Sequence, residues 1–400
     1  MSAPHVGPRV ITLGCRLNIA ESEHIRALLG SRDVTVVNSC AVTAEALKAS
    51  RAAIRRARRE RPGAELVVTG CAATIDPAGL AALPEVDRVV TNLEKLTPAA
   101  WDAPAPAPPA RFAGHARALV EVQNGCDHAC TFCIIPTGRG ASRSVPAGSV
   151  VERVQELVAA GHREVVLTGV DLTSYGADLP GAPTLGLLVE RILRLVPDLP
   201  RLRLSSLDGI EIDDRLFDLV TGEPRIAPHV HLSLQAGDDL ILKRMKRRHS
   251  RAQSVALVER LRARRPAIAI GADLIAGFPT ESDAAHANTA ALIADAQIVH
   301  AHIFPYSPRE GTPATRMPQV PREVVKTRAA ELRDRADVAR RHWLSSLIGT
   351  RQQVLVEAPG TRGHAANFAP VALATSSPIG TLVDVDVSAS DGTTLIGTPA

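Results

Sequence analysis

The placement of six cysteines constrains this chain more than any other feature. All of them fall within the first 133 of 400 residues, at Cys15, Cys40, Cys71, Cys126, Cys130 and Cys133. The last three form a compact C-x₃-C-x₂-C segment, whereas the first three are widely spaced. In a cytosolic chain of this length a disulfide framework is not expected, because cellular thiol pools keep cysteines reduced. The spacing therefore indicates metal ligation.

Each of the first three cysteines follows a predicted β-strand. Helical stretches at Glu21–Leu29 and Ala44–Arg61 alternate with strands, which we expect at Arg9–Gly14, Val34–Asn38 and Leu66–Thr69. This order predicts a parallel α/β domain over residues 1–97. Because the carboxyl ends of parallel strands share one edge of a sheet, Cys15, Cys40 and Cys71 are expected to converge there.

Three further segments complete an α/β chain. A proline- and alanine-rich run from Pro98 to Arg111 predicts an extended linker, bounded at residues 98–116. Residues 117–348 repeat a strand-then-helix pattern and end in a long helix, with strands expected at Ala118–Gln123, Glu164–Thr168, Arg201–Ser205, His229–Gln235, Ala267–Asp273 and Ile298–Phe304. Six such units favour an open, partial (β/α)6 TIM-like barrel over a closed eightfold one. Residues 349–400 predict a small C-terminal β-barrel.

Composition limits where the chain acts and what it binds. No stretch reaches the roughly 18 consecutive apolar residues of a membrane span, and the first thirty residues lack a signal-peptide pattern. We therefore predict a cytoplasmic protein with no membrane partner. The net charge of +4 permits nucleic-acid binding without requiring it, and aromatic residues at 2% argue against a surface of stacked rings.

The compact motif can present three thiolates to one metal centre. Structural zinc usually takes four ligands, and no fourth cysteine follows Cys133. Three thiolates instead suit a cubane iron–sulfur cluster that keeps one iron open. A structural zinc site is the alternative.

The motif sequences resemble the radical S-adenosylmethionine methylthiotransferases. The similarity rests on GCDHACTFCIIP at 125–136, TLGCRLN at 12–18, VNSCAVT at 37–43 and Gly70-Cys71, and it covers about residues 9–345. It implies a [4Fe–4S] cluster on Cys126, Cys130 and Cys133 that binds S-adenosylmethionine. It also implies a second, auxiliary [4Fe–4S] cluster on Cys15, Cys40 and Cys71 that carries the sulfur to be inserted. One S-adenosylmethionine would supply the methyl group and another the radical that attacks an unactivated aromatic carbon.

Within this family, the stretches at 204–212, 228–239 and 306–313 are most similar to the branch that acts on N6-threonylcarbamoyladenosine next to the tRNA anticodon. The resemblance thus implies methylthiolation at C2 of that base, with tRNA and a reductant such as flavodoxin or ferredoxin as partners and no role for DNA. The same chemistry on isopentenyladenosine tRNA, or on an aspartate of a ribosomal protein, is the alternative. A non-catalytic iron–sulfur RNA-binding protein is the alternative from another class.

The sequence also offers candidate cofactor-binding and RNA-binding residues. The cofactor candidates are the aromatic residue of the cysteine loop and residues at strand ends, namely Phe132, Gly169, Ser205, Gln235, Ile275 and Gly277. A basic run after the fourth barrel strand offers contacts to RNA phosphates through Lys243, Lys246, Arg247 and Arg248.

The last fifty residues are similar in position to a TRAM-type RNA-binding barrel but depart from it in charge. Arg351 and Arg362 are their only cations, against four carboxylates. We therefore expect this barrel to contribute little to RNA binding.

Overall fold

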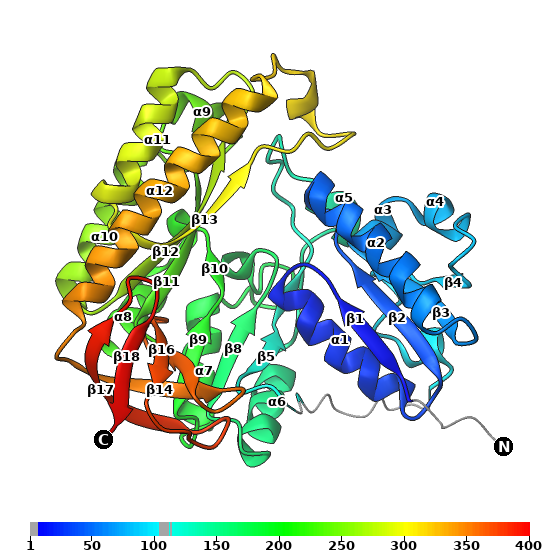
Figure 1. The fold of residues 1–400 in the computed structure, drawn as a ribbon, viewed down its shortest axis with the longest axis horizontal. Coiled ribbons are helices and arrows are strands. Elements are labelled where there is room, and N and C mark those ends of the chain that lie inside the picture. Colours follow the sequence, from blue (N-terminus) through cyan, green and yellow to red (C-terminus); the bar gives the residue numbers. More distant parts are fainter. Residues whose placement is uncertain (1–6, 104–111, 113) are drawn as a thin grey trace. The chain divides into compact units, whose positions relative to one another are not determined.

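The computed structural model describes residues 7–103, 112 and 114–400, which fall into two compact units (Figure 1). The described residues before Gly114, together with Asn124–Arg143 and Ser307–Thr312, make up unit 1. Unit 2 contains Gly114–Gln123, Ser144–Tyr306 and Pro313–Ala400. The C-x₃-C-x₂-C segment thus belongs to unit 1, whereas the sequence pattern grouped it with the domain at 117–348. Among the described residues, no helix combines the length and apolar character that crossing a membrane requires.

Unit 1 is built on a parallel sheet in the order β1-β2-β3-β4. Its strands are β1 (Arg9–Thr12), β2 (Val34–Ser39), β3 (Glu65–Gly70) and β4 (Arg88–Val89), and its helices are α1 (Arg16–Leu29), α2 (Ala44–Glu60), α3 (Cys71–Ile75), α4 (Pro77–Ala81) and α5 (Ile135–Arg139). Thr12 pairs with Asn38 and Ser39 with Gly70, so the three strands end side by side. The predicted βαβαβ order is confirmed.

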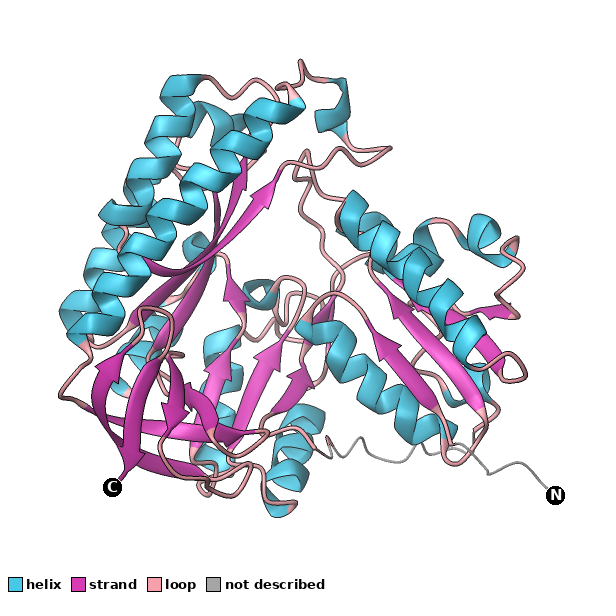
Figure 2. Ribbon diagram, viewed as in Figure 1, coloured by secondary structure: helices cyan, strands magenta, loops and turns pink. Residues whose placement is uncertain are grey.

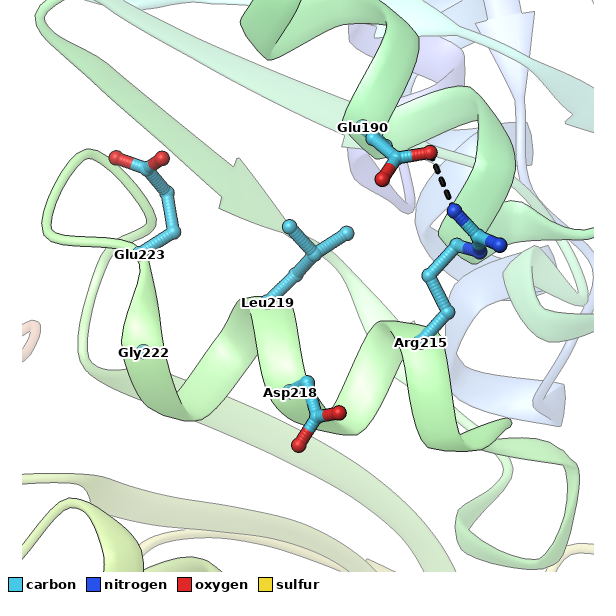
Figure 3. Close-up of a pocket in the computed structure, with 6 residues that line it drawn as sticks. All are labelled: Glu190, Arg215, Asp218, Leu219, Gly222 and Glu223. Carbon is cyan, nitrogen blue, oxygen red and sulfur yellow. Dashed lines mark hydrogen bonds and ion pairs between the residues drawn. The ribbon is translucent and has the colours of Figure 1, made fainter.

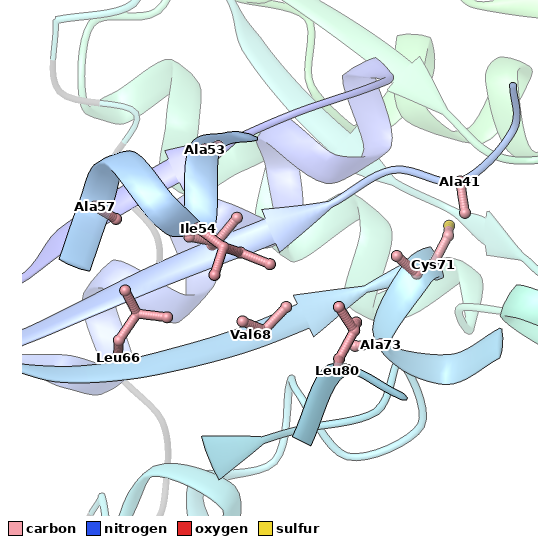
Figure 4. Packing of buried hydrophobic residues seen from close by; sticks show 11 residues of the cluster. Ala41, Ala53, Ile54, Ala57, Leu66, Val68, Cys71, Ala73 and Leu80 are labelled. Atoms are coloured by element: carbon pink, nitrogen blue, oxygen red, sulfur yellow. The ribbon is translucent and has the colours of Figure 1, made fainter. Parts of the chain in front are cut away.

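The two faces of this sheet are covered by different helices because side chains alternate along a strand. Leu66 and Val68 of β3 pack with Ile54 of α2 (Figure 4), whereas Val67 packs in a second cluster with Ile25 of α1. All six residues of β2 are buried, as expected for a central strand covered on both faces.

The predicted linker starts later than the proline run suggests. Pro98–Trp101 forms a short 3₁₀ helix, η1, and Trp101 is fully buried in the core of unit 1. Its Nε1 donates a hydrogen bond to the carbonyl of Lys95 at 2.7 Å. Burial of a large indole with a satisfied N–H outweighs the extended preference of the surrounding prolines. Residues 104–111 of the expected linker lie outside the described residues.

Unit 2 contains the predicted open barrel of parallel strands. One sheet has the order β5-β8-β9 and the next has the order β10-β11-β12-β13. Their bounds are β5 (Ala118–Glu121), β8 (Glu164–Thr168), β9 (Arg201–Leu204), β10 (Ser206–Leu207), β11 (His229–Gln235), β12 (Ala269–Ala276) and β13 (Ile298–Pro305). The strand expected at 201–205 is followed at once by β10, with Ser205 at the break. Short strands β6 (Gln123–Asn124) and β7 (Arg143–Ser144) flank the cysteine loop.

Helices cover the outer side of these strands. They are α6 (Ala147–Ala159), α7 (Leu185–Leu195), α8 (Asp214–Gly222), α9 (Asp239–Arg244), α10 (Arg251–Arg264), α11 (Asp283–Asp295) and α12 (Arg322–Ser346). Figure 2 shows α10, α11 and α12 side by side on one face of the β10–β13 sheet. Short 3₁₀ turns η2 (Leu172–Ser174), η3 (Gly209–Glu211) and η4 (Pro313–Arg316) lie in the connections.

The C-terminal residues form a closed five-stranded barrel, in the order β14-β15-β16-β18-β17, which confirms the predicted small β-barrel. Its strands are β14 (Arg351–Glu357), β15 (Arg362–Ala365), β16 (Pro370–Leu373), β17 (Leu382–Ser390) and β18 (Leu395–Pro399). Leu344 of α12 is fully buried in its apolar core. The C-terminal end of α12 and the small barrel therefore share one apolar core.

A buried carboxylate connects the open barrel to the small one. Glu164 of β8 is fully buried and forms ion pairs with Arg203 at 2.9 Å, Arg201 at 3.0 Å and Arg117 at 3.1 Å. Arg117 also pairs with Glu357 of β14 at 2.5 Å, and Arg201 donates to the Gln353 carbonyl at 3.0 Å. These contacts attach the small barrel through charge as well as through packing.

The same arginines hold an aromatic side chain of the small barrel. The ring centre of Phe368 lies 4.8 Å from the guanidinium carbon of Arg203 and 5.6 Å from that of Arg117. Phe368 has φ +72°, a left-handed conformation that is uncommon for a bulky residue. The strained backbone places the ring where it can cover two cations.

We predict that Glu164→Gln lowers the free energy of unfolding by about 3–5 kcal/mol at pH 7, because it leaves buried arginines without their counter-charge. Burial alone raises the pKa of Glu164, but Arg203 and Arg117 outweigh it and hold the pKa well below its usual range. The stabilisation is therefore present above the unfolded-state pKa of about 4.3 and is lost as the pH falls below it. Urea unfolding of wild type and variant between pH 7 and pH 3 measures both effects.

Glu190→Gln is the matched control for this prediction. Glu190 pairs with Arg215 at 2.5 Å (Figure 3), but both side chains are about half exposed, at 49% and 48%. An exposed pair contributes at most about 1 kcal/mol. Equal losses for the two variants would show that the Glu164 network does not stabilise unit 2.

Candidate metal and cofactor site

The first three cysteines converge at the carboxyl edge of the unit 1 sheet, as predicted. Cys15 precedes α1, Cys40 follows β2, and Cys71 begins α3 directly after β3. A Cβ on Gly14, which has φ +96°, would lie 2.9 Å from the Cys40 Cβ and 3.0 Å from its Sγ. The strand ends can approach this closely only because position 14 carries no side chain.

The three thiols are close enough to influence one another electrostatically. Burial raises the pKa of Cys40, and the neighbouring sulfurs of Cys71 and Cys15 raise it further. Thiolates at all three positions therefore need a compensating positive charge, which a metal centre supplies. Cys40 and Cys71 are buried whereas Cys15 is exposed, so the sulfur triad is accessible from one side.

The C-x₃-C-x₂-C loop folds into a turn that presents its sulfurs to backbone donors. The Cys126 N–H donates to the Gly140 carbonyl at 3.1 Å, which closes the loop on itself. The N–H of His128 donates to Cys126 Sγ, and that of Ile135 donates to Cys133 Sγ, both at 3.4 Å. Such N–H⋯S contacts stabilise thiolate ligands and tune iron–sulfur centres. The donor set and its surroundings fit an iron–sulfur cluster with three protein ligands.

Helix α5, which follows this loop, packs directly on helix α3 of the first triad. A Cβ on Gly138 would lie 3.4 Å from the Cys71 Cβ. The Asn92 side-chain amide donates to the Gly138 carbonyl at 2.6 Å and approaches Cys71 Sγ at 3.8 Å. Both cysteine sets are therefore built into the same compact unit.

A buried polar network lies beside the first triad, and sequence reasoning missed it. Glu21 is its centre and accepts from Arg139 Nη1 at 2.8 Å and from Lys95 Nζ at 2.5 Å. Arg139 also donates to Asn124 Oδ1 at 3.0 Å and to Asn18 Oδ1 at 2.5 Å. The members are far apart in sequence, so no local pattern reveals the network. Asn18 lies in TLGCRLN at 12–18, one of the segments that carried the family resemblance, but that motif does not reveal its partners.

Candidate cofactor residues in unit 2 lie at the carboxyl ends of barrel strands. Gly169 follows β8, and a Cβ there would meet Gln123 Oε1 at 2.9 Å. That same Oε1 accepts from the N–H groups of Val170 at 3.0 Å and Asp171 at 2.9 Å. Gln123 thus fixes the loop after β8 and requires glycine at its start.

Ser205 has a buried hydroxyl at the break between β9 and β10. Its side chain is 7% exposed, and its Oγ has no hydrogen-bond partner among the described residues. Buried hydroxyls are normally paired, so an unpaired one at a strand end suits a polar group of a bound molecule.

Two other strand-end candidates adopt left-handed backbone conformations. Gln235, at the end of β11, has φ +67°, which is unusual for a residue with a side chain and is common at functional sites. Gly277 has φ +70°, and a Cβ there would lie 2.5 Å from Val325 Cγ2. The Gly277 N–H donates to Glu281 Oε1 at 3.0 Å, which pairs with Arg328 at 2.9 Å.

The two remaining cofactor candidates differ in burial. Ile275 is buried in β12, opposite Phe304 of β13. Phe132 is half-buried in the cysteine loop and belongs to unit 1. The roles of Phe132, Gly169, Ser205, Gln235, Ile275 and Gly277 stay predictions.

The basic run after β11 separates into exposed and internally paired side chains. Lys243 and Lys246 are exposed. Arg247 is nearly buried, with its guanidinium 2.9 Å from Asp208 Oδ2 and 2.9 Å from the Ser233 carbonyl. Arg248 is 46% exposed but pairs with Glu211 at 2.7 Å. The two lysines are therefore the better placed of the four for phosphate contact.

Sequence reasoning also missed a histidine–aspartate group on three adjacent strands. Asp273 Oδ1 lies 2.9 Å from His231 Nε2 and 3.1 Å from His302 Nδ1. Burial raises the pKa of Asp273, but these two imidazoles outweigh it and lower the pKa.

A separate pocket on α7 and α8, lined by Glu190, Arg215 and Leu219 among others (Figure 3), contains none of the predicted site residues.

Comparison with known proteins agrees with this arrangement. Residues 120–293 match the Radical SAM superfamily, and residues 8–91 match the uncharacterized protein family UPF0004. The threonylcarbamoyladenosine tRNA methylthiotransferase MtaB of Rickettsia prowazekii is 47% identical over 382 residues, covering 91% of this chain and 90% of that protein. The protein of the same name from Chlamydia pneumoniae is 34% identical, with 97% of both chains covered.

A more distant relative and a solved structure complete the comparison. A tRNA-2-methylthio-N(6)-dimethylallyladenosine synthase of Parafrankia is 34% identical over 77% of this chain and 69% of that protein. The radical S-adenosylmethionine methyltransferase TsrM from Kitasatospora setae has a TM-score of 0.51 at 16% identity, covering 86% of this chain and 72% of that one. This last similarity shows the fold alone. On the sequence identities, the chain belongs to the radical S-adenosylmethionine methylthiotransferase family, is of the MtaB type, and is an enzyme.

Proposed function

We propose that this enzyme adds a methylthio group to C2 of N6-threonylcarbamoyladenosine next to the anticodon of tRNA. It would use one S-adenosylmethionine as methyl donor and a second as radical source, and it would act in the cytoplasm. The observation that carries the proposal is that two separate cysteine triads belong to one compact unit. The name and 47% identity of the Rickettsia relative support the choice of substrate.

The division of labour follows from the chemistry of the target. An adenine C–H bond has no useful acidity, so acid–base catalysis cannot activate it and a strong hydrogen-atom abstractor is needed. When bound, a [4Fe–4S] cluster on Cys126, Cys130 and Cys133 would supply the electron that cleaves S-adenosylmethionine to such a radical. Cys15, Cys40 and Cys71 would hold the second [4Fe–4S] cluster and the sulfur to be inserted.

The remaining residues bind and orient. Ser205 Oγ and the strand-end backbone at Gln235 and Gly277 are the proposed contacts for S-adenosylmethionine in unit 2. Lys243 and Lys246 would hold the RNA backbone, where phosphate contacts position a substrate without reading its sequence. A one-electron donor such as flavodoxin or ferredoxin would reduce the clusters.

Nucleoside mass spectrometry tests the reaction and the substrate together. In tRNA from a strain lacking this gene, the 2-methylthio derivative of N6-threonylcarbamoyladenosine should be absent, and the unmodified nucleoside should accumulate. Complementation with the wild-type gene should restore it, and complementation with Cys126→Ala should not. Loss of the methylthio mark from isopentenyladenosine instead would retain the chemistry and overturn the substrate. No change in either nucleoside would reject the tRNA function.

Iron and sulfide analysis tests the two-cluster arrangement. Anaerobically reconstituted wild-type protein should hold about eight iron ions per chain, and each triple Cys→Ala variant about four. The Cys15/Cys40/Cys71 variant should still cleave S-adenosylmethionine under reduction, whereas the Cys126/Cys130/Cys133 variant should not. Zinc without inorganic sulfide in the wild-type protein would contradict the proposal.

Salt-dependent tRNA binding tests the RNA surface. Lys243→Ala/Lys246→Ala should weaken binding and reduce the slope of log K against log salt by about 2, because each phosphate contact releases counterions. Arg322→Ala/Lys326→Ala on α12 removes the same charge from exposed positions and should leave the slope unchanged.

The small barrel is tested by point substitution in the same assay. Deletion of residues 350–400 would also uncover Leu344, so Arg351→Ala/Arg362→Ala is the cleaner comparison. We expect it to affect binding less than Lys243→Ala/Lys246→Ala does. A larger effect from Arg351 and Arg362 would assign RNA binding to the small barrel.

A further inference from the structure

The network around Glu21 contains more buried positive than negative charge. Glu21 and Lys95 are both completely buried, and Arg139 is 3% exposed. One carboxylate therefore serves two cations. Among the described residues, neither Lys95 nor Arg139 has an ion pair with any second carboxylate.

Neutral groups satisfy the hydrogen bonds of this network without balancing its charge. Arg139 donates to the side-chain oxygens of Asn18 and Asn124 as well as to Glu21. A buried, unbalanced charge is strongly unfavourable in a medium of low dielectric constant. The surplus therefore points to a further anion close by.

The first cysteine triad borders the network and could supply such an anion. Asn18 Oδ1 lies between Arg139 Nη2, at 2.5 Å, and Cys15 Sγ, at 3.9 Å. Gly138, the residue before Arg139, borders Cys71. Burial lowers the pKa of Arg139, but Glu21 and the thiolates of Cys71 and Cys15 outweigh it.

Lys95 responds to the same charges. Burial holds the pKa of Lys95 below its usual range, and Glu21 and Cys71, which raise it, do not outweigh burial and the repulsion from Arg139. An anionic group bound by the triad would therefore help to keep Lys95 protonated. The cations and the sulfurs stabilise each other's charged forms.

We propose that Lys95, Arg139 and Glu21 form a fixed buried charge that compensates the thiolate-bound cluster of the first triad and raises its reduction potential. This inference rests on the proposed function, in which that triad holds a [4Fe–4S] cluster. Three thiolates outweigh the 2+ charge of the [4Fe–4S] core, so the cluster with its ligands is an anion, and one-electron reduction by the external donor makes it more negative. A buried cation stabilises the reduced form more than the oxidised form. Lys95 and Arg139 act as positioning and tuning residues, not as catalytic ones.

The test uses full-length protein carrying Cys126→Ala, Cys130→Ala and Cys133→Ala, so that only the first triad can hold a cluster. Its midpoint potential is measured by titration with dithionite, monitored by electron paramagnetic resonance. Lys95→Met should lower the potential by about 59 mV or more, a tenfold change in the reduction equilibrium. Glu21→Gln should raise it, and Lys95→Arg, which keeps the charge, should leave it near the parent value.

Opposite shifts of the midpoint potential for Lys95→Met and Glu21→Gln support the inference. Structural damage alone would not lower the potential when a cation is removed and raise it when an anion is removed. A cluster that forms normally but shows the same potential in all variants overturns this inference and leaves the proposed function intact. Absence of any cluster in the parent triple variant overturns both. If Lys95→Met does not fold, the direction of the Glu21→Gln shift decides the question.

Discussion

The ion pair between Arg139 and Glu21 is the interaction on which the arrangement of unit 1 depends. Glu21 lies on α1, the helix that begins directly after Cys15. Arg139 is the last residue of α5, the helix that follows the C-x₃-C-x₂-C loop. Their contact at 2.8 Å is buried, where Coulomb attraction is strong and the loss of either partner is severe. This ion pair attaches α5, which lies more than a hundred residues after Glu21 in the sequence, to the sheet edge that carries the first triad. The two cysteine motifs thereby become parts of one structure.

Local patterns predicted most of the fold because each strand and helix is specified by its own residues. Glu164–Thr168 and His229–Gln235 have the same bounds in the structure as in the prediction. The cysteine edge was also predictable, since parallel strands place their carboxyl ends together. Trp101 was not, because its burial depends on the shape of a core formed by residues 10–90. The charges of Lys95 and Glu21 were missed for the same reason.

The small barrel illustrates how one fold can serve two purposes. An RNA-binding barrel needs exposed cations, whereas this one carries more carboxylates than arginines. One of those carboxylates, Glu357, pairs with Arg117 beside the buried Glu164, and the barrel's Phe368 covers Arg203. Within unit 2, the small barrel thus contributes one acidic and one aromatic side chain that contact arginines of the open barrel. That use of the module accounts for Glu357, one of its four carboxylates.

At several candidate cofactor residues, the residue type is determined by the backbone conformation and by close packing and not by a side-chain contact. Gly169 and Gly277 are fixed by close contacts with Gln123 and Val325, so a side chain at either position would displace its neighbour. Gln235 adopts a left-handed conformation at a cost in backbone energy that the surrounding strands must offset. Ser205 breaks a strand and leaves a buried hydroxyl unpaired. The left-handed backbone of Gln235 and the unpaired hydroxyl of Ser205 both cost free energy, and a polar molecule that hydrogen-bonded to Ser205 Oγ would offset the second of these costs.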